Sequence, residues 1–460
     1  MFRKNGWTKE KIQETSTIFN FSESYKKFLD VGKTEREVVE ISKKLAEENG
    51  FINICFKENL KTGDKVYFIN RNKNIVLSII GEDDILNGIN YIVSHIDSPR
   101  IDLKANPLYE ELDLAYMKTH YYGGIKKYQW ATIPLALHGV VVLETGEKIN
   151  LVIGEEETDP IFMIPDLLPH LWGKSQAERK APEVFQGEEL QIIVGSMPLY
   201  LEECESKELI KQHILNILNN KYGVSEEDFV SAELELVPAG KSRDLGLDRS
   251  LIAAYGQDDR ICAYTSLKAI LDLKNTPKKT IVCFLADKEE TGSNGSTGLQ
   301  STYLEYFTTE IIKKIKGTIT ISDLQKTLWS SKALSSDVNV AMDPIFKGVH
   351  DSMNAAKLNN GIVITKYTGA RGKSGTNDAD AEFVAEIRGM LNKNNIAWQI
   401  GMLGKVDEGG GGTVAMFLAQ KGINTIDVGP ALLSMHAPME ISSKLDVYET
   451  YRTYLAFYEL

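Results

Sequence analysis

Residues 279–298 read KTIVCFLADKEETGSNGSTG, an apolar stretch that stops at charged residues and continues into a glycine-rich loop. Residues 281–286 are short, apolar and bounded by polar residues, which predicts a buried strand. Apolar residues at helical spacing lie on both sides, over residues 258–273 and 296–315. A buried strand between two amphipathic helices is typical of an α/β fold with a parallel sheet.

The same alternation extends over most of the chain. Residues 9–50 have helical spacing, and short strands are expected next, at 65–70, 75–80 and 90–97. Beyond residue 237 helices and strands alternate to residue 460, with strands expected at 318–323, 338–343, 361–367, 397–403 and 424–429. We therefore predict an α/β domain with a mostly parallel sheet sandwiched between helices, formed by residues 1–100 and 238–460.

Residues 101–237 lack the alternation of helices and strands that is predicted for the rest of the chain. Residues 130–155 read as a β-hairpin whose turn is ETGE at 144–147, and residues 206–223 read as an amphipathic helix that ends on Gly223. We interpret this segment as a second, β-rich domain inserted into the first.

The composition excludes several classes of partner. The chain has 460 residues, a net charge of −12, and 43% hydrophobic and 25% charged residues, as expected of a soluble globular protein. The negative charge disfavours nucleic acid, and no apolar run approaches the ~20 residues of a membrane helix. The N-terminus lacks a secretory pattern and the four cysteines form no CxxC pair, so a cytoplasmic location is expected. These cysteines are Cys55, Cys204, Cys262 and Cys283.

Ionisable residues gather where the predicted strands end, which is where ligands bind in such sheets. His95 and Asp97 follow one strand, and Glu289 and Glu290 follow the strand at 281–286. Further candidates are Asp323 after 318–322, Asp337 before or within the strand at 338–343, His436 after the strand at 424–429, and Asp258 and Asp259 at a helix start.

Each of these motifs has a functional and a structural interpretation. Asp97, two residues from His95, faces the same side of a strand and would orient the imidazole, or else the pair belongs to a surface turn before Pro99. Of Glu289 and Glu290, one would ligate a metal while the other activates water, or both lie in a solvated acidic loop.

The remaining motifs are equally ambiguous when each is taken alone. Asp258 or Asp259 caps the following helix, and the other carboxylate is a candidate bridge between two metals. The glycine run DEGGGGT at 407–413 is a helix-entry loop or an anion site. Taken together, two histidines and several carboxylates suit Zn²⁺, Mn²⁺ or Co²⁺.

The motifs SHIDSPR, GQDDR, DKEETGS, SSDVNVAMDP and MHAP, in this order, resemble the aspartyl aminopeptidase and vacuolar aminopeptidase I family of two-metal exopeptidases. The resemblance spans nearly the whole chain, including the insert. It implies a zinc-peptidase-like fold with an inserted dimerisation domain and a metal-dependent aminopeptidase that takes peptides with a free N-terminus.

The resemblance assigns a role to each site residue. His95 and Asp337 would hold one metal, Glu290 and His436 the other, and Asp258 would bridge the two. Glu289 would be the general base and Asp97 would orient His95. Two divalent ions, most simply Zn²⁺, with Mn²⁺ or Co²⁺ as alternatives, would flank a water molecule that attacks the first peptide carbonyl.

The family also implies an assembly. Its inserted domain forms dimers and lends a histidine to the neighbouring active site, and the matching segment, IPDLLPHLWG at 164–173, points to His170. Relatives form dodecamers, so a homodimer that builds a larger oligomer is expected. Members selective for acidic N-terminal residues carry a basic residue near 361–375, where Lys366, Arg371 and Lys373 lie, so an acidic and a neutral preference both stay open.

Two alternative functions stay open. One is a related co-catalytic metallohydrolase, such as a glutamyl aminopeptidase or a deacylase, which substrate tests with aminoacyl and N-acyl compounds would separate. The other is a catalytically silent scaffold of the same fold, which would bind no metal.

Overall fold

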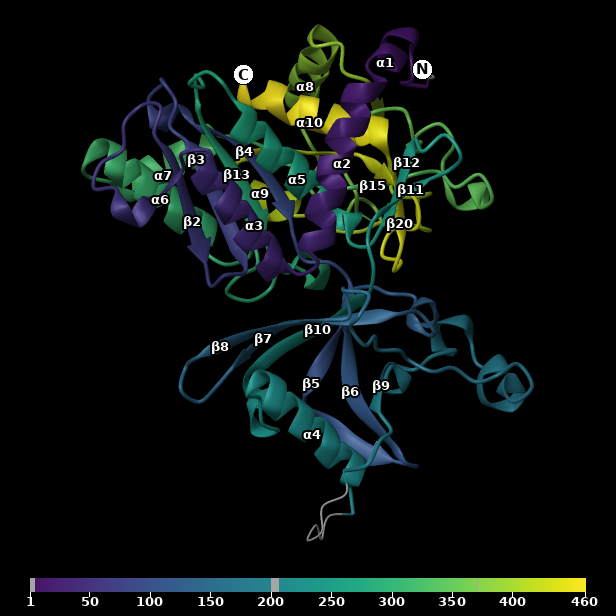
Figure 1. Ribbon diagram of the computed structural model, residues 1–460. Helices are drawn as coiled ribbons and strands as arrows, with labels where there is room; N and C mark the ends of the chain where they lie inside the picture. The colour runs from purple at the N-terminus through teal and green to yellow at the C-terminus, as the bar shows by residue number, and fades with distance from the viewer. Residues whose placement is uncertain (1–4, 200–206, 370) are drawn as a thin grey trace. The chain divides into compact units, whose positions relative to one another are not determined.

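The computed structural model describes residues 5–199, 207–369 and 371–460 (Figure 1). The chain forms two compact units. The first contains Met1–Ser98, Ser242–Met435 and Met439–Leu460, and the second contains Pro99–Lys241 and His436–Pro438. The described residues include no helix long and apolar enough to cross a membrane.

A nine-stranded mixed sheet forms the centre of the first unit. The strand order is β1-β2-β3-β13-β4-β14-β18-β16-β17. The four neighbours β13, β4, β14 and β18 run parallel, as predicted, whereas β3 is antiparallel to β13 and β16 is antiparallel to β18. The strands are β1 (Ile52–Asn53), β2 (Lys65–Asn70), β3 (Asn74–Ile79), β4 (Ile89–His95), β13 (Thr280–Ala286), β14 (Lys332–Ser335), β16 (Ile362–Thr365), β17 (Trp398–Ile400) and β18 (Asn424–Gly429).

Helices cover both faces of this sheet, which explains why its central strands are apolar throughout. In β13, Ile281, Cys283 and Leu285 belong to one core cluster and Val282 and Phe284 to another. The first cluster packs under α2 (Thr15–Val31), α3 (Glu35–Glu48), α5 (Gln257–Asp272), α8 (Ala381–Lys393) and α10 (Lys444–Tyr458); the second packs under α6 (Tyr303–Lys316), α7 (Ile321–Trp329) and α9 (Ala415–Gln420). The unit is therefore the predicted three-layer sandwich.

The sequence-based assignment was wrong at residues 318–323. These residues were expected to form a strand that ends at Asp323, but Thr320 caps α7 and Asp323 completes a capping box with it. Asp323 therefore stabilises a helix start and lies at no strand end. The helical region 9–50 also divides, into α1 (Lys9–Gln13), α2 and α3.

Smaller sheets complete the first unit. One joins β11 (Arg243–Leu245), β12 (Leu251–Ala254) and β20 (Glu440–Ser443), and the other joins β15 (Asn339–Val340) and β19 (Ala431–Leu432). Cys55, Cys262 and Cys283 are free thiols, and Cys204 lies outside the described residues.

The second unit is an antiparallel sheet with one long helix. Its strand order is β8-β7-β10-β5-β6-β9, and the expected hairpin is formed by β7 and β8. The helix α4 (Leu209–Tyr222) ends at Gly223, whose φ of 70° is the left-handed conformation that favours glycine. The strands are β5 (Arg100–Glu111), β6 (Leu114–Tyr122), β7 (Leu135–Val142), β8 (Lys148–Ile153), β9 (Ile192–Gly195) and β10 (Ala232–Pro238).

Candidate metal centre

Side chains from three neighbouring parallel strands and one helix meet at the carboxyl edge of the large sheet. His95 is the last residue of β4, and Asp337 follows β14 within the loop that leads to β15. Glu289 and Glu290 form a short 3₁₀ turn, η8 (Glu289–Thr291), shortly after β13. We call this segment the glutamate turn. Asp258 lies in the first turn of α5. Because β13, β4 and β14 are adjacent and parallel, their carboxyl ends carry these residues to one place.

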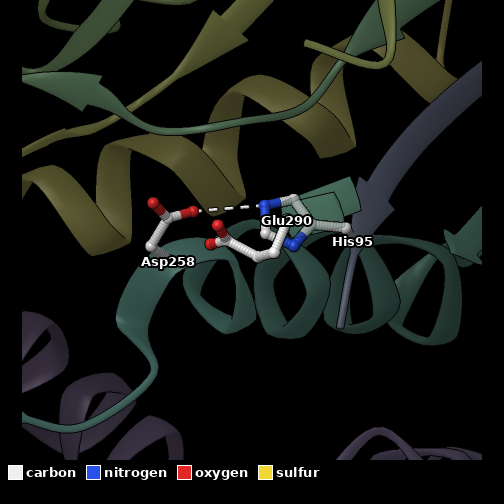
Figure 2. Close-up of side chains that lie close together, drawn as sticks. All are labelled: His95, Asp258 and Glu290. Atoms are coloured by element: carbon white, nitrogen blue, oxygen red, sulfur yellow. Dashed lines mark hydrogen bonds and ion pairs between the residues drawn. The ribbon is translucent and has the colours of Figure 1, made fainter. Parts of the chain in front are cut away.

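The imidazole of His95 is the centre of this cluster. Its Nε2 lies 3.1 Å from Asp258 Oδ1, 3.7 Å from Asp337 Oδ1 and 3.9 Å from Glu289 Oε2. Figure 2 shows Asp258 and Glu290 facing the same imidazole, with the contact to Asp258 drawn as a dashed line. His95 is 1% exposed and Asp258 is 3% exposed, so these groups meet away from bulk water.

The donor set fits divalent cations. His95, Asp258 and Glu290 place one ligand atom each within 4.8 Å of one another, and so do His95, Glu289 and Asp337. Carboxylates brought this close repel one another unless a cation or a proton compensates them. One imidazole nitrogen among carboxylate oxygens is a ligand set that Zn²⁺, Mn²⁺ and Co²⁺ accept.

Asp97 fixes both the histidine and the glutamate turn. His95 Nδ1 donates to the Asp97 backbone oxygen at 3.0 Å and lies 3.4 Å from its carboxylate. This arrangement leaves Nε2 to face the acidic cluster. The same carboxylate accepts the backbone N–H groups of Glu289 at 3.1 Å and Glu290 at 3.2 Å. The sequence predicted the contact with His95; it gave no sign of the contact with the turn.

Asp258 and Asp259 do not cap α5, contrary to one sequence-based interpretation. The N-cap position is Gly256, no side chain caps it, and both aspartates have non-helical dihedral angles with a cis peptide bond between them. Their side chains are instead turned to other partners. Asp258 faces His95, and Asp259 Oδ2 accepts the His95 backbone N–H at 3.3 Å.

Two residues that sequence reasoning missed hold Asp258 in place. The Asp258 backbone N–H donates to Glu440 Oε2 at 3.0 Å, and its carbonyl accepts the Ser98 hydroxyl at 2.7 Å. Ser98 lies within the SHIDSPR motif and Glu440 two residues after MHAP. Their nearness to motifs was the only available signal, because the partner of each lies more than 150 residues away in sequence.

The electrostatics follow from burial and mutual contact. Burial opposes a charged imidazole, but the hydrogen bonds to Asp258, Asp337 and Asp97 outweigh it and raise the pKa of His95 well above its usual value. Burial raises the pKa of Glu289 to about 8, although His95 acts in the opposite direction. A carboxyl group with a pKa near neutrality is suited to accept and return a proton.

Two predicted site residues belong to the second unit. His436 has a φ of 63°, and its Nδ1 lies 2.8 Å from the backbone oxygen of Gly124. His170 is exposed in the turn that precedes a short π-helical segment at Gly173–Ala177. The roles of both residues stay predictions.

The glycine run is a loop that leads to a helix, which agrees with the plainer of its two interpretations. Thr413 follows the run and donates its hydroxyl to Asp427 Oδ1 at 2.7 Å, which ties the loop to β18. The helix it enters, α9, has six residues, so its N-terminus carries little dipole.

An α/β sandwich with a buried imidazole among carboxylates at the carboxyl edge of its sheet is typical of metal-dependent hydrolases. Comparison with known proteins makes this assignment more specific. The profile of a family described as "Aminopeptidase I zinc metalloprotease (M18)" matches residues 28–458. The chain therefore belongs to this family, and it is a zinc metallopeptidase that removes residues from the N-terminus of peptides.

The relatives are similar over their full length. A Borrelia garinii protein described as a probable M18 family aminopeptidase 1 is 54% identical over 460 residues, which is 100% of both chains. The crystal structure of an M18 aminopeptidase from Thermotoga maritima superposes with a TM-score of 0.94 at 47% identity, covering 100% of this chain and 99% of that one. An aminopeptidase I structure from Clostridium acetobutylicum gives a TM-score of 0.91 at 48% identity, covering 99% of each chain.

Proposed function

We propose that the protein is a two-metal aminopeptidase whose centre is built around His95. The observation that carries the proposal is the position of three carboxylates within 3.9 Å of its Nε2 in a buried site. The geometry supports His95, Asp258, Glu290 and Asp337 as ligands. The inclusion of His436 and the division of the ligands between two ions come from the family motifs alone. One ion would be held by His95 and Asp337, the other by Glu290 and His436, with Asp258 between them.

Bound divalent ions would supply electrophilic assistance to the scissile carbonyl and lower the pKa of the attacking water. The chain contributes the proton transfers. Glu289 takes a proton from the attacking water and returns it to the nitrogen of the leaving peptide. Asp97 holds the imidazole of His95 and the backbone of Glu289 in the geometry that these transfers need.

A cavity in the first unit lined by three basic residues and Asp407 is the observation from which we propose a preference for acidic N-terminal residues. Arg371, Lys373 and Lys405 line a cavity of about 220 Å³, together with Tyr367 and Met402. Lys373 lies 2.7 Å from Asp378 and stacks over Tyr367, so Arg371 and Lys405 are the better candidates to meet a substrate carboxylate. Faster hydrolysis of aspartyl than of leucyl anilides would support this preference, and the reverse order would replace it with a neutral one.

The proposed mechanism is tested with one variant and its metal content. Glu289→Gln removes the proton acceptor and keeps the shape, so we expect kcat to fall about 10²–10⁴-fold while about two zinc ions per chain remain. His436→Ala should instead lose metal along with activity. The assay is an aminoacyl-anilide panel with added Zn²⁺, Mn²⁺ or Co²⁺. Wild-type turnover by Glu289→Gln would contradict the mechanism.

The same panel separates the alternatives. Hydrolysis of N-acylated but not of free aminoacyl substrates would indicate a deacylase. Metal analysis that finds no zinc in the purified chain would indicate a silent scaffold. Membership of the aminopeptidase family argues against both.

We also propose a homodimer that assembles further in the cytoplasm, with His170 reaching a neighbouring active site. The segment around His170 exposes apolar side chains, which is typical of a protein interface. Leu171→Asp should lower the mass measured by light scattering, and an unchanged mass would place the interface elsewhere. The exposed apolar residues are Ile161, Met163, Leu167, Leu168, Leu171 and Trp172.

A further inference from the structure

The loop that carries Glu289 and Glu290 begins and ends on two buried polar residues. We define the catalytic loop as residues 287–297, from Asp287 at the end of β13 to Thr297. Asp287 is 1% exposed and Thr297 is 3% exposed. Neither residue belongs to the groups that could hold a metal ion.

A direct hydrogen bond joins the two ends of this loop. The Thr297 hydroxyl donates to Asp287 Oδ2 at 2.5 Å. Thr297 is held a second time, because its backbone oxygen accepts the side-chain amide of Asn74 at 2.7 Å. Asn74 is the first residue of β3, so the loop is attached both to its own start and to the sheet.

The loop between these ends is tightly folded. Lys288 and Ser293 have φ values of 67° and 57°, and the Ser293 backbone N–H donates to the Lys288 oxygen at 2.7 Å. A Cβ on Gly298, the next residue after the loop, would lie 2.1 Å from the Ser293 oxygen. Such a loop transmits a shift at its base to the glutamate turn, which follows Asp287 by only two residues.

The surroundings of Asp287 make its ionised form costly in free energy. Burial, with Glu35 and Asp97 nearby, raises the pKa of Asp287 to about 7, whereas the hydrogen bond from Thr297 and Lys73, which pairs with Glu35 at 3.3 Å, act in the opposite direction. Burying a carboxylate beside two others costs free energy that a neutral hydrogen-bonding side chain would avoid. A carboxylate oxygen is, however, a strong acceptor that fixes a hydroxyl in one orientation.

We propose that Asp287 and Thr297 are positioning residues, an Asp287–Thr297 clasp that keeps the catalytic loop closed and so places Glu289 over the scissile bond. This inference rests on the proposed role of Glu289 as the proton acceptor. Neither residue of the clasp is among the proposed metal ligands. It acts through the backbone of the loop, in parallel with the two hydrogen bonds from the glutamate turn to Asp97.

The predicted consequence is a selective loss of turnover. A misplacement of a catalytic group by ~1 Å costs up to about 10²-fold in rate. Thr297→Val keeps the volume and removes the hydroxyl, so kcat should fall about 10- to 100-fold. KM should stay within about twofold, because the change affects a group that acts only in the chemical step.

Three further variants make the test specific. Thr297→Ser keeps the hydroxyl and should restore kcat to within about threefold of wild type. Thr291→Val removes an exposed hydroxyl from the same loop, which makes a long 3.4 Å bond to the Lys288 oxygen, and should leave kcat unchanged. Asp287→Asn keeps an acceptor without the charge, and should lie between Thr297→Val and wild type.

The measurements are kcat, KM and zinc content on the wild type and all four variants. An equal loss of kcat in Thr297→Ser and Thr297→Val would overturn the clasp, since it would show that packing rather than the hydroxyl matters. Unchanged kcat in Thr297→Val would overturn it as well, and if that variant does not fold, Asp287→Asn decides with the same criterion. If the proposed role of Glu289 is itself wrong, Glu289→Gln will keep full activity, which distinguishes that outcome from a failure of the clasp.

Discussion

At the scale of single residues, Asp97 shows how one carboxylate can organise a site without touching substrate. It accepts two backbone N–H groups of the glutamate turn and lies beside His95 Nδ1. These contacts engage the Asp97 carboxylate. His95 Nε2 lies on the other side of the imidazole, 3.9 Å from the Glu289 carboxylate. Asp97 therefore positions two groups of the proposed centre.

The proposed role of Glu289 as the proton acceptor predicts how the reaction depends on pH. Burial raises the pKa of this carboxyl group to about 8, and only its ionised form can accept a proton. Nearby cations stabilise the ionised form, so in the metal-loaded enzyme the pKa should be lower than this value. We expect kcat/KM to rise with pH along a limb whose midpoint lies below pH 8, measured from pH 5 to 9. A rate that falls as pH rises from 5 to 7 would contradict the assignment.

The sequence predicted the residues of the site better than their contacts. His95, Asp97, Asp258, Glu289 and Glu290 could be found because each follows a strand or opens a helix. Their hydrogen bonds to Ser98, Glu440 and the glutamate turn depend on which strands become neighbours, and a linear pattern does not contain that information. The hydrogen bond between Asp287 and Thr297 was missed for the same reason, since the two residues meet only in the folded loop.

At the scale of elements, one stretch of sequence can carry signals for both a strand and a helix, and the prediction followed the wrong one at residues 318–323. Residues 318–321 read TITI, a run of β-branched residues that favours a strand, but Thr320 and Asp323 also form a capping box. The cap satisfies backbone N–H groups within the segment itself, whereas a strand would need a neighbouring strand to do so. The segment therefore forms the helix α7. Strand β14 has four residues and gave no detectable signal, although it positions Asp337.

A charge network joins three elements of the first unit and predicts its acid sensitivity. Asp244 of β11 lies 2.7 Å from Lys26 of α2 and 2.8 Å from Lys444, which begins α10 and is fully buried. Burial opposes the Asp244 carboxylate, but its bonds to Lys26, Lys444 and Arg249 lower its pKa below the usual range. This stabilisation is present above about pH 4 and is lost as pH falls through the lowered pKa.

Asp244→Asn should accordingly lower the free energy of unfolding by about 3 kcal/mol at pH 7, because Lys444 loses its nearest counterion. Urea unfolding followed by circular dichroism measures this loss. The difference from wild type should shrink as pH falls below 4. Glu23→Gln is the control: Glu23 is about half exposed and contacts the same lysines, so it should cost less than about 1 kcal/mol. Equal effects of the two substitutions would contradict the network.

At the scale of the whole molecule, the layers could be predicted and the strand order could not. Alternating helices and strands indicate a sandwich, but β13 pairs with β3 and β4, which precede it by about 200 residues. The parallel centre and the antiparallel neighbours β3 and β16 result from such distant pairings. Apolar strands of this kind fit several positions in a sheet equally well.

The acidic centre should make the stability of the molecule depend on metal. Repulsion among its carboxylates opposes folding, and a bound cation relieves it, so zinc at 100 times its Kd adds about 2.7 kcal/mol per ion. For a chain of this size, that corresponds to an increase in Tm of about 3 °C for each ion. Differential scanning calorimetry with and without a chelator measures the change. Glu289→Gln should keep the shift, whereas an identical Tm in zinc and in chelator would rule out a cation at this site.

The hydrogen bonds that hold Asp258 have a consequence for the chain while it is being synthesised. They connect it to His95 over 163 residues and to Glu440 over 182 residues, so the centre needs both halves of the chain. A ribosome that has synthesised the chain only as far as residue 400 has produced His95, Asp258 and Glu290 but neither strand β18 nor Glu440. We therefore expect nascent chains to be inactive, which would spare neighbouring peptides from premature cleavage during translation.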